Sequence, residues 1–401
     1  MIDKNKKSGR KKNKKEKVFT VGRIILLTVL SLLMVFLILV YIFLNFYKPP
    51  QNTKVDIAND PNFLVVSDSD IEGEVLTPPV SPQSERNRDC YTFLIAGIDV
   101  MGGTTDTLMI AMFNTKDYTI SVLNIPRDTY VRTSGHTGKI NGVYSRGRSN
   151  ARSDGITDKD ALNKAGMEYL EKMITFTFGI TIDRHVLINL EGLQVLVDKI
   201  GGVSFDVPLR MKYDDPDQNL HINLQAGVQD IDGKKAEQLI RFRHGNIYSS
   251  TSREPNYYDI GYPGEDIGRI KTQQAFMAAI AKKIFDNFSM TTIKNLFDVG
   301  SKYMTTNISV ADISSFGPKL TNVKPENIRF HTLPSVWIGS TGRHIAYKQD
   351  AMMIINKYYN PYKNNIPESS FNIYDKDLEN YSGGKPDYFS IDGTTMADFL
   401  K

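Results

Sequence analysis

The chain has 401 residues, 41% of them hydrophobic, which is enough to bury a sizeable core. Its net charge is +4, but residues 1–23 hold ten basic and two acidic residues, a balance of +8, so the rest of the chain sums to −4. A nucleic-acid-binding domain is expected to be basic, and this charge balance excludes one from most of the chain. The single cysteine, Cys90, excludes an intramolecular disulfide.

Residues 24–47, directly after the basic segment, contain no charged residue. About 20 apolar residues in a helix cross the hydrocarbon core of a membrane. Bulky Leu, Phe and Tyr residues continue to the end of this segment, where a cleaved signal peptide would have small residues. We therefore expect a basic cytoplasmic tail over 1–23, a retained transmembrane helix over 24–47, and an extracytoplasmic remainder. An exported domain without disulfides suits a bacterial cell surface.

Residues 48–90 are rich in Pro, Ser, Asn and charged residues and lack periodicity, which predicts an extracytoplasmic linker. The composition changes at Tyr91, where long apolar runs begin. The apolar runs YTFLIAGID, DTLMIAMFN and TISVLNIP predict three strands, the last two joined as a hairpin across the turn-like TKDY.

Helical patterns follow in DKDALNKAGMEYLEKMITF and EGLQVLVDKIGG, and strands in HVLINL and VSFDVP. A long helix begins near Asp266. Alternating strands and helices of these lengths predict an α/β fold, a mixed-sheet α/β/α sandwich over residues 91–345. The turn-rich residues 346–401 predict a C-terminal extension that is only partly ordered.

Polar residues at the ends of the predicted strands are candidates for chemistry. Asp99 and Asp106 flank the VMGGTT loop, and paired carboxylates at a glycine-rich loop can bind a hard cation such as Mg²⁺. They are also ordinary turn residues. Arg127 and Asp128 follow Pro126 directly after an apolar strand, where a surface turn is the plain alternative. Each pair leaves both readings open.

In LIRFRH, Arg241 and Arg243 stand two residues apart. If this segment is extended, both guanidinium groups point to one face and Phe242 to the other. Two guanidinium groups on one face suit a phosphate, although a solvated strand face is an equal alternative.

The segment DIGRIKTQQAFMAAIAKKI places Asp266, Arg269 and Gln273 on one helical stripe. That stripe continues through apolar residues, namely Met277, Ile280 and Ile284. Charged groups on a core-directed face need partners, because an unpaired buried charge is costly. This favours a functional role for Arg269 and Gln273, while Asp266 can also serve as a helix N-cap.

The motifs GID, TTDT, NIPRDTYV, KING, IRFRH and DIGRIKTQQ occur in the order and approximate spacing of the LytR–CpsA–Psr family. The chain resembles that family from Tyr91 to Gly339, and the basic tail with a single span matches the usual layout. The resemblance implies a membrane-anchored phosphotransferase that moves a glycan phosphate, such as a teichoic acid or capsule chain. The implied donor is a polyprenyl pyrophosphate carrier, the acceptor is peptidoglycan, and no nucleic acid is involved.

The resemblance also implies roles for individual residues. Five side chains match those that bind the pyrophosphate, namely Arg127, Arg241, Arg243, Arg269 and Gln273. Asp99 and Asp106 match the side that binds Mg²⁺ or another divalent cation. Asp266 matches the acid paired with Arg269, a base for the acceptor hydroxyl, and Arg127 is the second catalytic residue. A lipid tail would also need an apolar tunnel, and the apolar elements between Met167 and Val207 could line it or form ordinary core.

Two positions depart from the family pattern, because Thr104 and Thr272 stand where the family usually has arginine. Loss of two positive charges predicts weaker pyrophosphate binding. This leaves two further hypotheses beside the active transferase, a non-catalytic polyprenyl-phosphate-binding scaffold and a transcriptional attenuator. The predicted topology argues against an attenuator, since only the short basic tail would face the cytoplasm.

Overall fold

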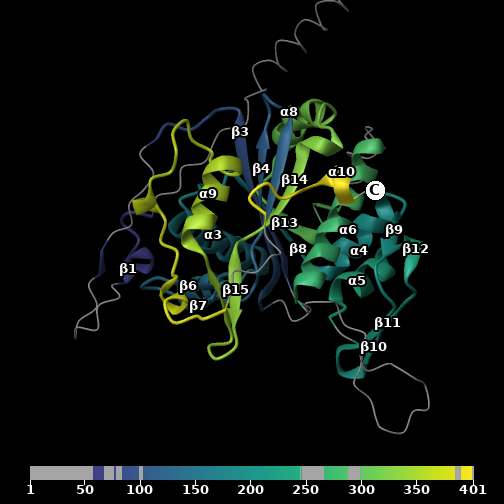
Figure 1. Ribbon diagram of the computed structural model, residues 1–401, viewed down its shortest axis with the longest axis horizontal. Coiled ribbons are helices and arrows are strands. Elements are labelled where there is room, and N and C mark those ends of the chain that lie inside the picture. The colour runs from purple at the N-terminus through teal and green to yellow at the C-terminus, as the bar shows by residue number, and fades with distance from the viewer. Residues whose placement is uncertain are drawn as a thin grey trace, which may run out of the picture. The chain divides into compact units, whose positions relative to one another are not determined.

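The computed structural model describes residues 57–66, 76–77, 84–98, 103–243, 245, 266–287, 299–300, 302–383 and 390–399 (Figure 1). All of them belong to one structural unit, residues 52–401. The predicted basic tail and the predicted span over 24–47 lie outside the described residues. Within the described ranges, no helix combines the length and the apolar character needed to cross a membrane.

A mixed sheet of seven strands lies at the centre, in the order β13-β8-β3-β4-β5-β14-β17. Its strands are β3 (Cys90–Ile98), β4 (Thr105–Asn114), β5 (Thr119–Asn124), β8 (Arg184–Ile188), β13 (Met304–Thr306), β14 (Ile328–Thr332) and β17 (Thr394–Thr395). The predicted β4–β5 hairpin is confirmed. Strands β3, β5, β8 and β14 all run in one direction, so their carboxyl ends meet at the same edge, where β4 begins.

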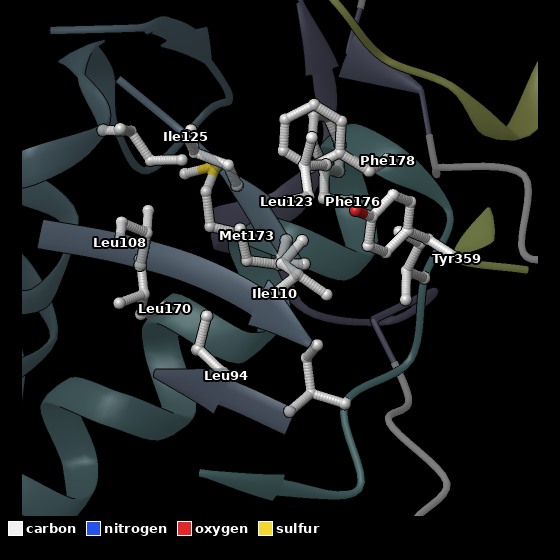
Figure 2. Close-up of a cluster of buried hydrophobic side chains, with 14 of the residues drawn as sticks. Leu94, Leu108, Ile110, Leu123, Ile125, Leu170, Met173, Phe176, Phe178 and Tyr359 are labelled. Atoms are coloured by element: carbon white, nitrogen blue, oxygen red, sulfur yellow. The ribbon is translucent and has the colours of Figure 1, made fainter. Parts of the chain in front are cut away.

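Helices cover both faces of this sheet, so the predicted central mixed sheet with flanking helices is confirmed. One face packs against α2 (Val143–Ser153), α3 (Lys159–Phe178) and α9 (Lys348–Tyr358). Figure 2 shows Leu170 and Met173 of α3 packed beside Leu94, Leu108 and Ile110 of the strands. The other face packs against α6 (Asp266–Asp286), α8 (Val310–Leu320) and α10 (Met396–Phe399).

Helix α3 shows how local sequence sets an element's limits. Its N-cap is Asp158, whose side chain accepts a hydrogen bond from the Ala161 amide. The helix stops at Gly179, which has a φ of 68° that glycine adopts without steric cost. The sequence therefore predicted this helix to within about two residues at each end.

A second hydrophobic cluster lies beyond β8 and includes Val197, Ile222, Phe242 and Phe276. It is built from α4 (Leu190–Lys199), β9 (Val203–Val207), β10 (Met211–Asp215), β11 (Leu220–Leu224), β12 (Gly227–Ile231), α5 (Gly233–Arg241) and part of α6. Strand pairs β9–β12 and β10–β11 support it. The remaining short strands are β1 (Val65–Val66), β2 (Leu76–Thr77), β6 (Tyr130–Arg132), β7 (Thr137–Lys139), β15 (Ser335–Ile338) and β16 (Arg343–Ala346).

The described parts of the predicted linker and of the predicted C-terminal extension pack into the main core. In the predicted linker, Ile57 and Phe63 are buried, and Lys172 binds Asp60 at 2.7 Å. In the predicted C-terminal extension, Tyr359 and Phe371 join the same cluster, and β17 adds a strand to the sheet. The described residues of both segments therefore belong to the packed structure. Ile57 and Phe371 stand singly among polar residues and give no periodic signal, yet both are buried in the core.

Lowering the pH is expected to destabilise the fold through His331, a buried residue of β14. Its Nδ1 atom lies 2.7 Å from the Tyr359 hydroxyl, and burial lowers its pKa from 6.5 to about 4. Between these values the unfolded chain binds a proton that the folded chain does not. The contribution of His331 to the free energy of unfolding is complete above pH 6.5. It falls by about 3 kcal/mol as the pH drops from 6.5 to about 4.

Urea unfolding at stepped pH measures this effect. His331→Gln should flatten the slope of unfolding free energy against pH, whereas the same change at the exposed His221 should leave it unchanged. Equal slopes in the His331→Gln variant and the wild-type protein would show that another group controls acid stability.

Candidate functional site

A cavity of about 610 Å³ opens at the edge of the sheet where the parallel strands end. In open α/β sheets, ligands bind outside the carboxyl ends of the strands. Most of the lining residues come from β3, β4, β8, α4, α5 and α6, and others come from β10, β11, β13 and the turn after β5. They include Ile95, Thr104, Asp106, Arg127, Val186, Ile188, Leu193, Leu196, Tyr213, Ile240, Arg241, Arg243, Arg269, Gln273, Phe276 and Met277.

The floor of the cavity is one face of β3 and β8, lined by Ile95, Val186 and Ile188. In β8, His185 and Leu187 are buried on the α3 side, while Val186 and Ile188 are only partly buried and line the cavity. Val186 pairs with Ile95 of β3. Central strands that keep apolar side chains partly exposed on one face show that this space is hollow and not filled core.

Helices α4 and α6 form the apolar wall. Leu193 and Leu196 contribute from α4, and Phe276 and Met277 from α6. The predicted stripe along α6 is confirmed, because Ile280 is buried and packs in the same hydrophobic cluster. The sequence raised a tunnel lined between Met167 and Val207 as an open alternative, and the β8 and α4 residues of the cavity lie in that range.

Arg127 lies in a turn that also faces the cavity. The Thr129 amide and hydroxyl both bond to the Pro126 carbonyl, at 2.9 and 2.6 Å, which closes the turn directly after β5. Arg127 Nη1 donates to Asp106 Oδ1 at 2.6 Å. The segment is therefore a turn, and it places Arg127 at the cavity.

The LIRFRH segment is not extended throughout, because Arg241 is the last residue of α5. The chain becomes extended only at Phe242, which is fully buried, and Arg243 follows. This bend at the helix end places both arginines along the cavity and Phe242 in the core, as the alternation predicted. The sequence could not distinguish a helix end from a strand here, because both direct Phe242 away from Arg241 and Arg243.

Arg269 and Gln273 lie one turn apart on α6 and both line the cavity. Arg269 is 8% exposed, and Gln273 Nε2 donates to the Ile240 carbonyl at 3.0 Å. That bond joins α6 to the end of α5, next to Arg241. Asp266 is the first residue of α6, but its side chain lies outside what the structure describes.

Sequence reasoning missed the groups that orient Arg241. Glu237 accepts from its Nη1 at 2.9 Å, and Gln218 accepts from its Nη2 at 2.8 Å. Gln194 Nε2 in turn donates to Glu237 at 2.6 Å. The spacing of Glu237 and Arg241, four residues apart on one helix, is the signal that could have revealed this pair.

The described cavity lining is strongly basic at its polar side. Four arginines contribute against one acid, Asp106, a balance of +3 among the described lining residues. No cysteine nucleophile is near at hand, because Cys90 is buried in β3 and burial raises the pKa of its thiol to about 11. The site is therefore suited to binding an anion attached to an apolar chain.

The predicted metal pair is only half described. Asp106 lines the cavity with its side chain 47% exposed, whereas Asp99 falls outside the described residues. Among the described residues, no cluster of three or more His, Cys, Asp or Glu could hold a metal ion. Asp106 alone still suits Mg²⁺, which protein sites often hold through one or two carboxylates plus substrate phosphate.

The two threonines that depart from the family pattern differ in position. Thr104 lines the cavity. Thr272 is 6% exposed, does not belong to the cavity lining, and donates its hydroxyl to the Gly268 carbonyl of its own helix at 3.1 Å. Only Thr104 therefore removes a possible positive charge from the described cavity wall.

Comparisons with known proteins identify relatives of this chain. The chain is 29% identical over 293 residues to the cell wall biosynthesis protein LcpA of Corynebacterium glutamicum, covering 70% of this chain and 50% of LcpA. It is 24% identical over 215 residues to the polyisoprenyl-teichoic acid–peptidoglycan teichoic acid transferase TagV of Bacillus subtilis, covering 52% of this chain and 46% of TagV. The chain thus spans about half the length of these relatives.

The crystal structure of protein gbs0355 from Streptococcus agalactiae has the same fold, with a TM-score of 0.56 and 20% identity over 74% of this chain and 96% of that chain. The model of the LytR_cpsA_psr family matches residues 40–366, which include every candidate site residue. On this match over most of its length, the chain belongs to the LytR_cpsA_psr family.

Proposed function

We propose that the chain is a phosphotransferase. It transfers the phosphate of a glycopolymer, such as a teichoic acid or capsule chain, from a polyprenyl pyrophosphate carrier to peptidoglycan. The observation that carries this proposal is a single cavity with an apolar wall on α4, α6 and β8 and four arginines among its lining residues. This combination matches both halves of a lipid pyrophosphate. The relative TagV is named as a polyisoprenyl-teichoic acid–peptidoglycan teichoic acid transferase, which supports this proposal.

The reaction needs little covalent chemistry from the protein. The acceptor oxygen attacks the phosphorus that bears the glycan, a new P–O bond forms, and the bond to the bridging oxygen breaks. Polyprenyl phosphate leaves, and the hydroxyl proton passes to a base, for which we propose Asp266. Negative charge grows on the phosphoryl and leaving oxygens, and preorganised guanidinium groups stabilise it.

We further propose that Asp106 and Asp99 bind Mg²⁺ at the pyrophosphate. A hard cation bound by oxygen ligands would neutralise part of the diphosphate charge. The position of Asp106 supports this role, since its carboxylate lies at the cavity and bonds to Arg127 through Oδ1. Arg127 thereby orients the carboxylate as well as the substrate.

We place this site at the outer face of a bacterial membrane, with the predicted helix over 24–47 as its anchor. The carrier lipid would then reach the cavity from the bilayer to which the chain is attached. A non-catalytic polyprenyl-phosphate-binding scaffold is the second candidate. Thr104 favours it, because the cavity wall there holds a neutral side chain where family members usually carry arginine.

Release of polyprenyl phosphate distinguishes these candidates and tests the metal. The full chain in detergent would receive a lipid-pyrophosphate-linked glycan and soluble peptidoglycan fragments, with Mg²⁺ or with a chelator, and mass spectrometry would follow the released lipid. We expect release only with Mg²⁺, and Asp106→Asn should abolish most of it. Because Asp106 is half exposed, its loss should change stability by about 1 kcal/mol or less.

Asp160→Asn, at an exposed position on α3, is the matched control and should retain wild-type release. An Asp106→Asn enzyme with normal rate and normal Mg²⁺ dependence would contradict the metal assignment. A wild-type protein that binds the lipid donor but never releases polyprenyl phosphate would favour the scaffold.

A further inference from the structure

Trp337 is the only tryptophan of the chain, and 46% of it is exposed. It lies on β15, in a two-stranded hairpin with β16, and pairs with His344. The described chain has few other large apolar side chains with comparable exposure, and Val228 and Met353 belong to other elements. Trp337 belongs to none of the described hydrophobic clusters, and its ring instead lies beside His344 and Lys139.

Two contacts fix this hairpin beside the turn that holds Arg127. The His344 amide donates to the Asp128 carbonyl at 2.9 Å, and Thr129 forms a parallel bridge with His344. The Arg343 guanidinium of β16 lies 4.2 Å from the ring centroid of Tyr130 on the neighbouring strand β6. Figure 1 shows β15 next to β6 and β7. The tryptophan is therefore held in a set place relative to the Arg127 turn.

A chain of side chains joins Trp337 to the cavity. Lys139 Nζ lies 5.6 Å from the Trp337 ring centroid and 3.1 Å from Asp128 Oδ1. Asp128 Oδ2 is 3.9 Å from Arg127 Nε, and Arg127 lines the cavity. Lys139 begins the KING motif, and neither it nor Asp128 has a role in the proposed transfer. The aromatic ring thus stands two side chains away from a group that binds the pyrophosphate.

The chemistry of this group suits a sugar ring. The C–H bonds of one face of a pyranose pack against the negative face of an aromatic ring, and its hydroxyls seek charged hydrogen-bond partners. Here Lys139 supplies donors and Asp128 supplies acceptors next to the ring. One aromatic side chain surrounded by polar groups is too small for a stable protein interface.

We propose that Trp337, Lys139 and Asp128 form the acceptor subsite, where a sugar ring of the peptidoglycan glycan stacks on Trp337. This inference rests on the proposed transfer to peptidoglycan and adds where the acceptor binds. A glycan held there would enter from the β15–β16 side and present its hydroxyl beside the Arg127 turn. The lipid carrier would occupy the cavity on the other side of that turn.

Intrinsic fluorescence tests binding without any turnover, because Trp337 is the only tryptophan. The full chain in detergent, without lipid donor, would be titrated with soluble glycan fragments released from peptidoglycan by a muramidase. Excitation at the red edge of tryptophan absorption suppresses the tyrosine signal. We expect a saturable change in emission with these fragments and none with dextran of similar size. No change with either glycan would overturn the subsite.

Kinetics with the lipid donor give an independent readout. Trp337→Ala should raise the acceptor KM by about fivefold to tenfold and leave kcat and the donor KM nearly unchanged. Trp337→Phe, which keeps an aromatic ring, should recover most of the affinity. The control Val228→Ala removes an exposed apolar side chain from β12 and should behave as wild type. Thermal melting of each variant checks the fold.

The outcomes separate this inference from the proposed function. Saturable fluorescence without any lipid turnover supports the glycan subsite and contradicts the phosphotransferase. Turnover that depends on Arg127 but has the same acceptor KM in Trp337→Ala contradicts the subsite and leaves the phosphotransferase in place.

Discussion

Replacing Arg127 with alanine is expected to lower glycopolymer transfer by about 10²–10³. The guanidinium group is preorganised, because the Pro126–Thr129 turn fixes its backbone and Asp106 bonds to its Nη1 at 2.6 Å. It therefore meets developing negative charge without first being reoriented. The side chain is 23% exposed and lies outside the hydrophobic clusters, so the fold should survive. The kcat for polyprenyl phosphate release measures the loss.

Lysine at position 127 should rescue this loss only in part, because it keeps the charge but not the planar two-point hydrogen bonding. Arg152→Ala, at an exposed position near the end of α2, removes the same side chain far from the cavity and should be neutral. If Arg127→Ala and Arg152→Ala turn over at the same rate, the proposed site is wrong.

The fold was largely readable from the sequence because its signals are local and repeated. The hairpin of β4 and β5 follows from two apolar runs around a short polar turn. Helix α6 follows from a stripe that begins at Asp266 and continues through Ile280 to Ile284. By contrast, Ile57 and Phe371 are isolated apolar residues in polar segments, and only the assembled core gives them a place. Burial that depends on long-range contacts leaves no periodic pattern.

The sequence predicted the residues of the candidate site but not the shape of its cavity. Arg127, Arg241, Arg243, Arg269 and Gln273 were all predicted, and the fold brings all five to one cavity. Three features could not be predicted. The bend at Arg241 depends on the buried Phe242, and the partners Gln218 and Gln194 come from separate elements. The hollow itself is invisible in sequence, since Val186 and Leu193 have the same residue types as filled core.

Filling this cavity should strongly weaken binding of a lipid tail. Val186→Trp is expected to lower the affinity for a polyprenyl pyrophosphate by on the order of 100-fold, while inorganic pyrophosphate binds as before. Val186 lies on the cavity floor, partly exposed and paired with Ile95, so a larger ring has room to enter the space instead of the core. An indole group there occupies volume that several isoprenoid carbons would fill, and each excluded methylene costs about 0.8 kcal/mol of binding.

Calorimetric titration of the full chain with a short-chain polyprenyl pyrophosphate, and separately with pyrophosphate, measures both affinities. The matched control is Val228→Trp, the same substitution on a strand at a residue that is 74% exposed and not part of the cavity lining. Because Trp also suits strands, neither variant should lose much stability. The comparison separates binding of the isoprenoid tail from binding of the head group, because the four cavity arginines stay intact in both variants. Unchanged lipid affinity in Val186→Trp would mean that the isoprenoid chain binds elsewhere and that this apolar space serves another ligand.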